Sequence, residues 1–372
     1  MIIKTITCHN VYNYGASLQA YALQHYLETL DNDVEIIDFQ PDFLSYRYKP
    51  FKIAKTGKAA AICKVLPFMR YPYGLVKNRR MFMTWGRKKS FDSFTTNFLH
   101  LTKRYNTSEE LRNDPPKADV YVAGSDQIWN TQYMNGKEPA FYLDFGNAKK
   151  ISYAASFAVS KIQEAWKPFV KKELSHLNHI SVREKTGLMI LEDLGIKDGK
   201  VVVDPVFLLD KEHWLNLCNQ AKKYNFKKEG YILVYDFEND ERIRSLAIKL
   251  KDNLHIPIIN VNDHNTLSYV DKNINDAGPL EFLSLVNNAK VVISSSFHAT
   301  SFSLIFNKQF YVFPLKGSSN SSRMENLMGS IGHYERFNSK EILPDIDFQE
   351  VNGRLSDSIN RSKQILSDFL EN

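Results

Sequence analysis

The sequence of 372 residues contains only three cysteines, Cys8, Cys63 and Cys218, and no Cys-x-x-Cys pair. Three thiols so far apart argue against a disulfide framework and a cysteine-rich zinc site, and they are typical of a cytoplasmic protein. No apolar run reaches the length of about 18 residues that a membrane-spanning helix needs. The first residues have no long apolar core behind a basic start, so we expect no secretory signal peptide and a cytoplasmic location.

Acidic residues are missing between Phe43 and Phe91, where 13 lysines and arginines alternate with aromatic and aliphatic side chains. The net charge is +6, yet outside this segment acidic residues outnumber basic ones. Each cation near an anionic membrane leaflet contributes about 1 kcal/mol. We therefore expect residues 43–91 to be an insertion that touches the inner face of the cytoplasmic membrane. The alternative is a solvated basic insertion or a subunit contact. A nucleic-acid partner is not expected, because no binding motif accompanies the charge.

Glycine-rich phosphate loops are also missing, which excludes a dinucleotide-binding fingerprint and a Walker-type site. Strand and helix patterns alternate along the chain instead, and the alternation restarts after residue 206. This rhythm predicts an α/β fold of two Rossmann-like domains that face a cleft. We expect an N-terminal domain over residues 1–207, a C-terminal domain over residues 208–340 that opens on a polar linker at 208–230, and a last helix within 341–372 that packs back on the first domain.

The segment around His298 carries the strongest functional signal. A predicted strand at Val291–Ile293 enters a predicted helix at Phe297–Phe306 through three serines. Open α/β sheets place reactive side chains at such a carboxyl edge, and the first N–H groups of a helix suit an anion. We expect His298 to lie beside a bound anion. The plain alternative is a histidine packed in the core or on the surface.

Two further polar segments follow predicted strands. In the first, Gly15 allows a close backbone approach, and Asn13 and Gln19 are uncharged groups of the kind that bind sugar hydroxyls. In the second, Asp126, Trp129 and Asn130 are typical of a carbohydrate site, where an aromatic ring packs on the sugar. The alternatives are an ordinary helix start and a strand-capping turn with a core tryptophan.

Cations occur near the ends of two other strands. Arg183 ends a strand and could bind a carboxylate or phosphate through two hydrogen bonds; the alternative is a surface pair with Glu184, which contributes little. Lys316 and Arg323 stand on a Gly/Ser-rich loop after the His298 helix, where they could enclose a small anion. Each of them could equally be solvated.

Taken in order, these segments resemble the polysaccharide pyruvyl transferase family. The resemblance covers the chain from residue 1 to about residue 335, and it rests on five motifs at Asn13–Leu23, Gly124–Asn130, Ser181–Glu184, Asp204–Leu209 and Ser296–Lys308. It implies a GT-B-like fold and a transfer from phosphoenolpyruvate to two sugar hydroxyls, which gives a cyclic ketal and phosphate. No cofactor and no metal site are expected.

The resemblance implies His298 as general acid and Arg183 at the donor. Many members have an arginine two residues before the histidine, where this chain has Ser296. The expected donor site therefore comprises Arg183, Ser296, Lys316 and Arg323, and the expected acceptor site comprises Asn13, Gly15, Gln19, Asp126, Trp129 and Asn130. Because histidine titrates near neutral pH, we expect the affinity for phosphoenolpyruvate to fall as the pH rises through about 7.

The expected acceptor is a polyprenyl-diphosphate-linked glycan, a precursor of a bacterial capsule or exopolysaccharide, with a galactose 4,6-diol as the family-based choice. Two other functions remain open. A GT-B glycosyltransferase would use a nucleotide sugar, with Glu281 or Glu325 at its ribose. A non-catalytic glycan-binding relative would have lost the donor site with the arginine that Ser296 replaces.

Overall fold

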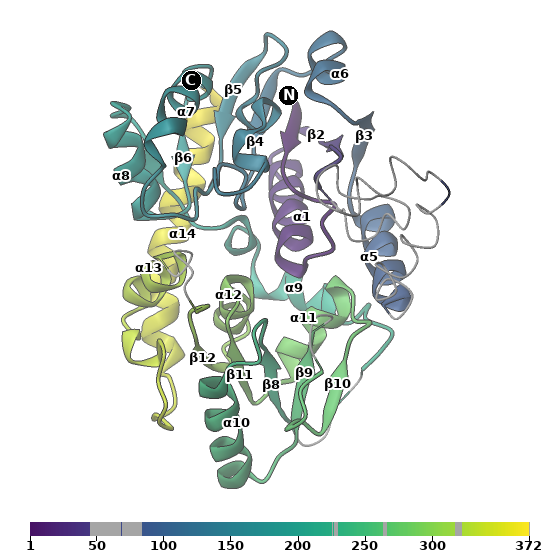
Figure 1. Cartoon of the computed structure of the whole chain (residues 1–372), viewed down its shortest axis with the longest axis vertical. Helices are drawn as coiled ribbons and strands as arrows, with labels where there is room; N and C mark the ends of the chain where they lie inside the picture. Colours follow the sequence, from purple (N-terminus) through teal and green to yellow (C-terminus); the bar gives the residue numbers. More distant parts are fainter. Residues whose placement is uncertain are drawn as a thin grey trace.

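The computed structural model describes residues 1–44, 68, 84–224, 226, 230–262, 266–316 and 322–371. Two parallel five-stranded sheets lie in two separate α/β units, one above the other in Figure 1. This confirms the predicted fold class. Within the described residues, no helix is long and apolar enough to cross a membrane.

The first sheet has the order β3-β2-β1-β4-β5. Its strands are β1 (Ile2–Ile6), β2 (Asp33–Phe39), β3 (Leu101–Tyr105), β4 (Val120–Ala123) and β5 (Lys149–Ser152). A short pair, β6 (Ser181–Val182) and β7 (Lys200–Val201), continues beyond β5 through isolated bridges such as Ala155 to Val182. The helices of this unit are α1 (Tyr14–Glu28), α5 (Trp85–Phe98), α6 (Ser108–Asn113), α7 (Lys167–Leu174) and α8 (Lys185–Asp193).

The second sheet repeats the pattern in the order β10-β9-β8-β11-β12. Its strands are β8 (Ile232–Tyr235), β9 (Ile258–Val261), β10 (Lys272–Ile274), β11 (Val291–Ser294) and β12 (Gln309–Val312). The helices are α10 (Glu241–Leu254), α11 (Pro279–Asn288), α12 (Phe297–Ile305) and α13 (Ser322–Ile331). Strands β8 and β11 are buried at every position, as their continuous apolar sequences require in a sheet covered on both faces.

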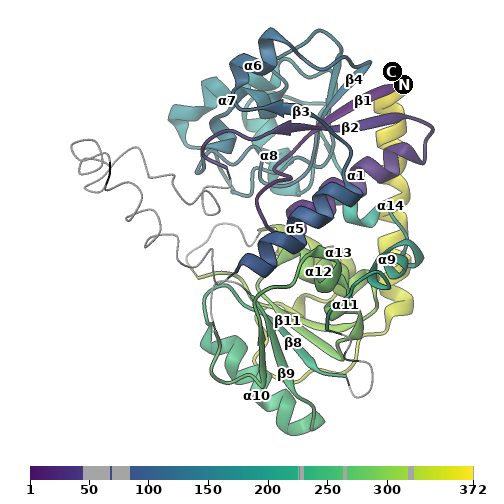
Figure 2. The same ribbon diagram turned by 90° about the vertical axis from the view of Figure 1, so that its right-hand side faces the viewer.

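An aromatic cluster joins the two units. Helix α1 is buried almost all round, because it lies between the first sheet and the second unit (Figure 2). The ring of Tyr14 stacks on Phe282 of α11 at 4.3 Å. Arg87, which is 2% exposed, lies over the Tyr14 ring and donates to the carbonyl oxygens of Tyr12 (2.9 Å) and Ala277 (3.3 Å). Arg87 therefore joins the two units and is not one of the surface cations predicted for residues 43–91.

The last helix, α14 (Phe348–Glu371), runs along both units (Figure 1). Its first half packs with the second unit, and its end packs with Ile3 and Val120 of the first sheet. The Oγ of Ser362 accepts a hydrogen bond from the Val203 amide at 3.0 Å, and Lys149 Nζ donates to the carbonyl oxygen of Leu370 at 3.3 Å. The end of the helix thus packs on the first unit.

Two parts of the predicted organisation need comment. The linker predicted at 208–230 contains a helix, α9 (Lys211–Cys218), whose Trp214 is fully buried against Phe302 of α12. Apart from residues 43, 44, 68 and 84–91, the basic insertion lies outside the described residues, so its membrane contact stays a prediction. The division into residues 1–207, 208–340 and 341–372 likewise stays a prediction.

Candidate active site

The carboxyl edges of the two sheets face each other across a cavity of about 560 Å³. In each sheet, the chain order reverses between two neighbouring strands, β1 and β4 in the first and β8 and β11 in the second, and ligands bind at such points in open α/β sheets. Both units supply lining residues: Cys8, Val11, Asn13, Leu44, Asp126, Gln127, Tyr133 and Asn135 from the first, and Phe237, Ser295, Ser296, Phe297, His298, Leu315, Arg323 and Met324 from the second.

His298 occupies the first turn of α12 and lines this cavity. The residue before the helix, Ser296, has extended backbone angles and accepts from the Ala299 amide at 3.4 Å, which makes it the N-cap. Two groups of the first unit hold the imidazole. Nε2 lies 3.4 Å from Oδ2 of Asp204, and the ring packs against Gly15 so closely that an added Cβ would overlap it.

Asp204 is fully buried and binds several donors. Its Oδ2 accepts from NH1 of Arg183 at 2.5 Å and from the hydroxyl of Ser125 at 3.3 Å, and its Oδ1 accepts from the Val206 amide at 3.1 Å. Burial alone would raise the pKa of Asp204, but His298 and Arg183 outweigh it and hold that pKa well below its usual range. Asp204 is therefore an anion beside the imidazole of His298.

Replacing Asp204 with asparagine should destabilise the fold at neutral pH by about 3–5 kcal/mol, because it breaks the closest of the ion pairs around the buried Arg183; the carboxylates of Asp126 and Glu184 lie farther away, at 3.8 and 4.0 Å. The pKa of Asp204 is lowered by folding, so its contribution is fully present above the ordinary carboxyl pKa near 4 and is lost as the pH falls further. Urea unfolding of both proteins at several pH values measures this. A difference below about 1 kcal/mol at neutral pH, or one that grows on acidification, would contradict the role given to Asp204.

Two guanidinium groups flank the ring of Phe297. The Cζ atom of Arg183 lies 4.8 Å from the ring centroid and that of Arg323 lies 5.9 Å from it. Burial, with Arg183 nearby, lowers the pKa of Arg323 to about 10, so Arg323 stays charged at neutral pH. Its Nε, and the Nε and NH2 of Arg183, are cut off from solvent without a hydrogen-bond partner among the described residues. The Nε of Arg323 is suited to an anionic ligand, whereas the Nε and NH2 of Arg183 already face the carboxylates of Glu184 and Asp126 at 4.0 and 3.8 Å.

The two arginines occupy different places. Arg323 lines the main cavity and also a second cavity of about 250 Å³ behind Phe297. Arg183 lines only the second of these and already binds Asp204. Lys316 lines neither cavity; its side chain is 61% exposed and lies 3.6 Å from Asp240. Of the cations predicted at the donor, Arg323 alone is beside His298 in the main cavity.

The residues predicted for the acceptor site also lie in different places, some at the cavity and some in the core. Asn13 and Asp126 line the cavity, whereas Gln19, Trp129 and Asn130 are fully buried. Gln19 donates to Thr7 Oγ1 at 2.9 Å, Trp129 donates to the Phe141 carbonyl oxygen at 3.0 Å, and Asn130 donates to Gln127 Oε1 at 3.2 Å. These three side chains support the loops behind the cavity and are not exposed to a sugar bound in it. Gly15 contacts His298 instead.

Sequence reasoning gave no role to three residues that the structure brings to the site: Asp204, Phe297 and Tyr133. Asp204 stands in a motif that was recognised, but its partners Ser125 and Arg183 follow β4 and β6 and His298 lies in α12, and no local pattern reveals them. Tyr133 is 53% exposed where it lines the cavity, four residues beyond the buried Trp129. Glu281, considered above for a nucleotide ribose, accepts from the Gly278 amide at 3.0 Å and caps its own helix.

Solved structures similar to this chain show the fold. The UDP-GlcNAc 2-epimerase of Neisseria meningitidis bound to UDP-GlcNAc matches over 100% of both chains with a TM-score of 0.50 and 11% identity. The epimerase of Methanocaldococcus jannaschii, in complex with UDP-GlcNAc and UDP, gives a TM-score of 0.48 at 12% identity over 97% of this chain and 93% of that one. ADP-heptose lps heptosyltransferase II of E. coli gives 0.39 at 10% identity over 98% and 100%. The first of these matches, at 11% identity, shows a GT-B-like fold alone.

Sequence comparison shows the family. A search of the curated proteins finds no match. The family model for polysaccharide pyruvyl transferase matches residues 13–317, a range that contains all five motifs and 12 of the 16 residues that line the cavity; Cys8, Val11, Arg323 and Met324 lie outside it. This chain therefore belongs to the polysaccharide pyruvyl transferase family.

Proposed function

We propose that this protein transfers the three-carbon group of phosphoenolpyruvate to two hydroxyls of a sugar in a polysaccharide precursor, forming a cyclic pyruvate ketal. Family membership implies a pyruvyl-transferring enzyme with a polysaccharide acceptor. The observation that carries the finer proposal is the presence, in one cavity between the two units, of His298 and Arg323, a half-buried cation whose buried Nε has no hydrogen-bond partner among the described residues.

The reaction needs an acid at one carbon of the donor and cations around the rest of it. Protonated His298 donates its proton to C3 of phosphoenolpyruvate, and a sugar hydroxyl attacks C2. The C2–O bond to phosphate then breaks, and a second hydroxyl closes the ring at C2. Of the two hydroxyl protons, one replaces the proton that His298 gave and the other leaves with phosphate. Nε2 lies 3.4 Å from Oδ2 of Asp204, so we assign the transfer to the other nitrogen, Nδ1, which lies beside Gly15.

The donor is assigned to the second-unit side of the cavity. Arg323 binds its carboxylate or phosphate, and Ser295 and Ser296 line the wall beside His298. Arg183 acts through Asp204 and adds positive charge behind Phe297. This arrangement supplies a cation although position 296 has no arginine.

The acceptor sugar is assigned to the opposite wall. Asn13 and Asp126 offer an amide and a carboxylate to its hydroxyls, and Gln127 and Asn135 are polar neighbours on the same wall. Tyr133 provides the exposed aromatic face that was first assigned to Trp129. An exposed ring of this kind packs on the apolar face of a sugar.

Calorimetric titration with phosphoenolpyruvate tests the donor assignment. We expect saturable binding to the unaltered protein, and a loss of about 10- to 100-fold in affinity for Arg323→Ala, since one charged hydrogen bond contributes about 1.5–3 kcal/mol. The Lys316→Ala variant is the matched control, because it removes an exposed cation outside both cavities, and it should bind as the unaltered protein does. Absence of phosphoenolpyruvate binding, or tight binding of a UDP-sugar in its place, would overturn the proposal.

A lipid-linked acceptor at the cytoplasmic membrane completes the proposal. Its support is the composition of residues 43–91, whose 13 cations follow one another without an acidic residue. A panel of lipid-linked sugars incubated with phosphoenolpyruvate would identify the acceptor, since NMR of the product shows the ketal methyl and the two bridged oxygens. Retention of the protein on vesicles containing anionic lipid at low salt tests the membrane contact. If the protein fails to bind these vesicles, the proposed membrane contact of residues 43–91 is wrong.

A further inference from the structure

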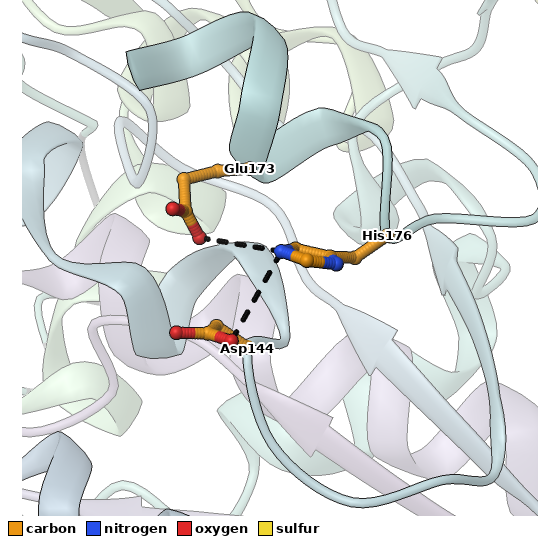
Figure 3. Close-up of side chains that lie close together, drawn as sticks. All are labelled: Asp144, Glu173 and His176. Carbon is orange, nitrogen blue, oxygen red and sulfur yellow. Dashed lines mark ion pairs between the residues drawn. The ribbon is translucent and has the colours of Figure 1, made fainter.

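Three potential metal ligands converge in the first unit, outside both cavities described above. Asp144, Glu173 and His176 each direct one ligand atom to a common point, and these atoms lie within 4.8 Å of one another (Figure 3). Nε2 of His176 lies 3.8 Å from Oε2 of Glu173 and 4.0 Å from Oδ1 of Asp144. None of the three lines the cavity that holds His298.

Two of these ligand atoms are buried and lack partners. Oε2 of Glu173 and Nε2 of His176 are both cut off from solvent without a hydrogen-bond partner among the described residues, and the Glu173 side chain is only 3% exposed. Burial, together with the Asp144 carboxylate, raises the pKa of Glu173. Buried polar groups in folded proteins are nearly always satisfied, so this pair indicates a missing ligand.

Local structure explains the convergence. Glu173 stands at the end of α7 and His176 one turn later, so the spacing Glu-x-x-His puts both on one face. Asp144 follows a short 3₁₀ helix, Pro139–Tyr142, that packs beside α7. The outer oxygens are engaged elsewhere: Oδ2 of Asp144 accepts from Arg112 at 3.1 Å, and Oε1 of Glu173 lies 3.7 Å from Lys172. Each carboxylate therefore keeps one oxygen for the inner cluster.

We propose that Asp144, Glu173 and His176 bind a zinc ion that links α7 to the loop after Pro139–Tyr142. One imidazole nitrogen and two carboxylate oxygens form a ligand set that zinc accepts, at bond lengths of about 2.0–2.2 Å. Tetrahedral ligands at that length are roughly 3.4 Å apart. The separations of 3.8 and 4.0 Å between the imidazole and the two carboxylates are close to that value, and the two carboxylate oxygens, which lie within 4.8 Å of each other, must move together when the ion binds. Water completes the coordination.

The site has a structural role, separate from the transfer reaction. Tyr142, at the end of the bridged 3₁₀ helix, stacks on Trp129 at 5.6 Å, and Trp129 supports the loop that carries Asp126 and Tyr133 into the main cavity. Zinc would thus stabilise the packing of Tyr142 on Trp129, and through it the position of that loop.

Titration of metal-stripped full-length protein with ZnCl₂ tests the site. We expect one ion per chain, a rise in Tm that grows with zinc concentration, and affinity about 100-fold or more weaker in Glu173→Gln and in His176→Asn. The matched control is His255→Asn, which changes an exposed histidine at the end of α10 in a backbone conformation that asparagine tolerates. This control should bind zinc as the unaltered protein does.

The metal-free Tm separates the proposal from a plain ion pair. If zinc is the ligand, Glu173→Gln without metal should be at least as stable as the unaltered protein, since an unpaired buried carboxylate is removed. If Glu173 and His176 only pair with each other, Glu173→Gln should lower the metal-free Tm and no zinc should bind. That result, or zinc binding that survives both Glu173→Gln and His176→Asn, would overturn the proposal.

Discussion

Gly15→Ala is expected to lower kcat by about 100-fold or more, because a displacement near 1 Å of a catalytic group can have that effect. The added Cβ would overlap the His298 ring, Nδ1 above all, and would lie only 2.6 Å from Cε1. Gly15 belongs to α1 of the first unit and His298 to α12 of the second. The substitution therefore displaces the proposed acid, or moves one unit away from the other.

Helix propensity works in the opposite direction. An alanine within a helix is favoured over glycine by about 1 kcal/mol, so unfolding of α1 would not explain lost activity. The affinity for phosphoenolpyruvate should stay within a few fold, since Arg323 does not contact Gly15. A large fall in kcat with intact donor binding is the expected signature of a misplaced acid.

Steady-state kinetics and donor titration on Gly15→Ala give the two quantities. Gly353→Ala is the matched control: Gly353 also lies in a helix, α14, but an added Cβ there meets nothing within 4 Å. It should leave kcat unchanged. Activity of Gly15→Ala equal to that of this control would show that the imidazole is not held as the structure has it.

The sheet order explains why the location of the site could be predicted. Buried central strands such as Val291–Ser294 have continuous apolar sequences, so they and the polar residues that follow them are visible in the sequence. Strands β3 and β10 are edge strands with partly exposed residues, and their short polar sequences resemble loops, so sequence patterns do not reveal them. The carboxyl edge that carries His298 does not depend on them.

The failures within the site have a different cause. Asp126 and Trp129 are three residues apart in one loop, yet Asp126 faces the cavity and Trp129 the core. Lys316 and Arg323 are similarly close in sequence, but Lys316 lies beside Asp240 and Arg323 beside Phe297. Composition reveals that a segment is polar or aromatic; tertiary packing decides which side chain faces a ligand. For the same reason Arg87, one of 13 cations in the basic segment, could not be recognised as an interface residue.

Loss of the imidazole itself should have the largest effect. His298→Gln is expected to lower kcat by about 100- to 10,000-fold, the range that positioned acid–base catalysis contributes. Glutamine keeps a polar side chain near Asp204 but cannot give up a proton at neutral pH. Donor affinity should fall much less than kcat, because Arg323 remains in place.

The pH dependence of donor binding identifies the group. The sequence predicts that affinity for phosphoenolpyruvate falls as the pH rises through about 7, and we assign this fall to His298. Ionisation of the donor phosphate also changes in this range, and it contributes equally to every variant. The difference between the profiles of the unaltered protein and His298→Gln therefore isolates the imidazole.

Titrations at several pH values on both proteins, with His255→Asn as the control for loss of a surface histidine, measure it. Parallel profiles, or a kcat of His298→Gln within about tenfold of that of the unaltered protein, would show that another residue donates the proton. If donor binding still depended on Arg323, the assignment of the donor site would hold and only the assignment of His298 as the acid would fail.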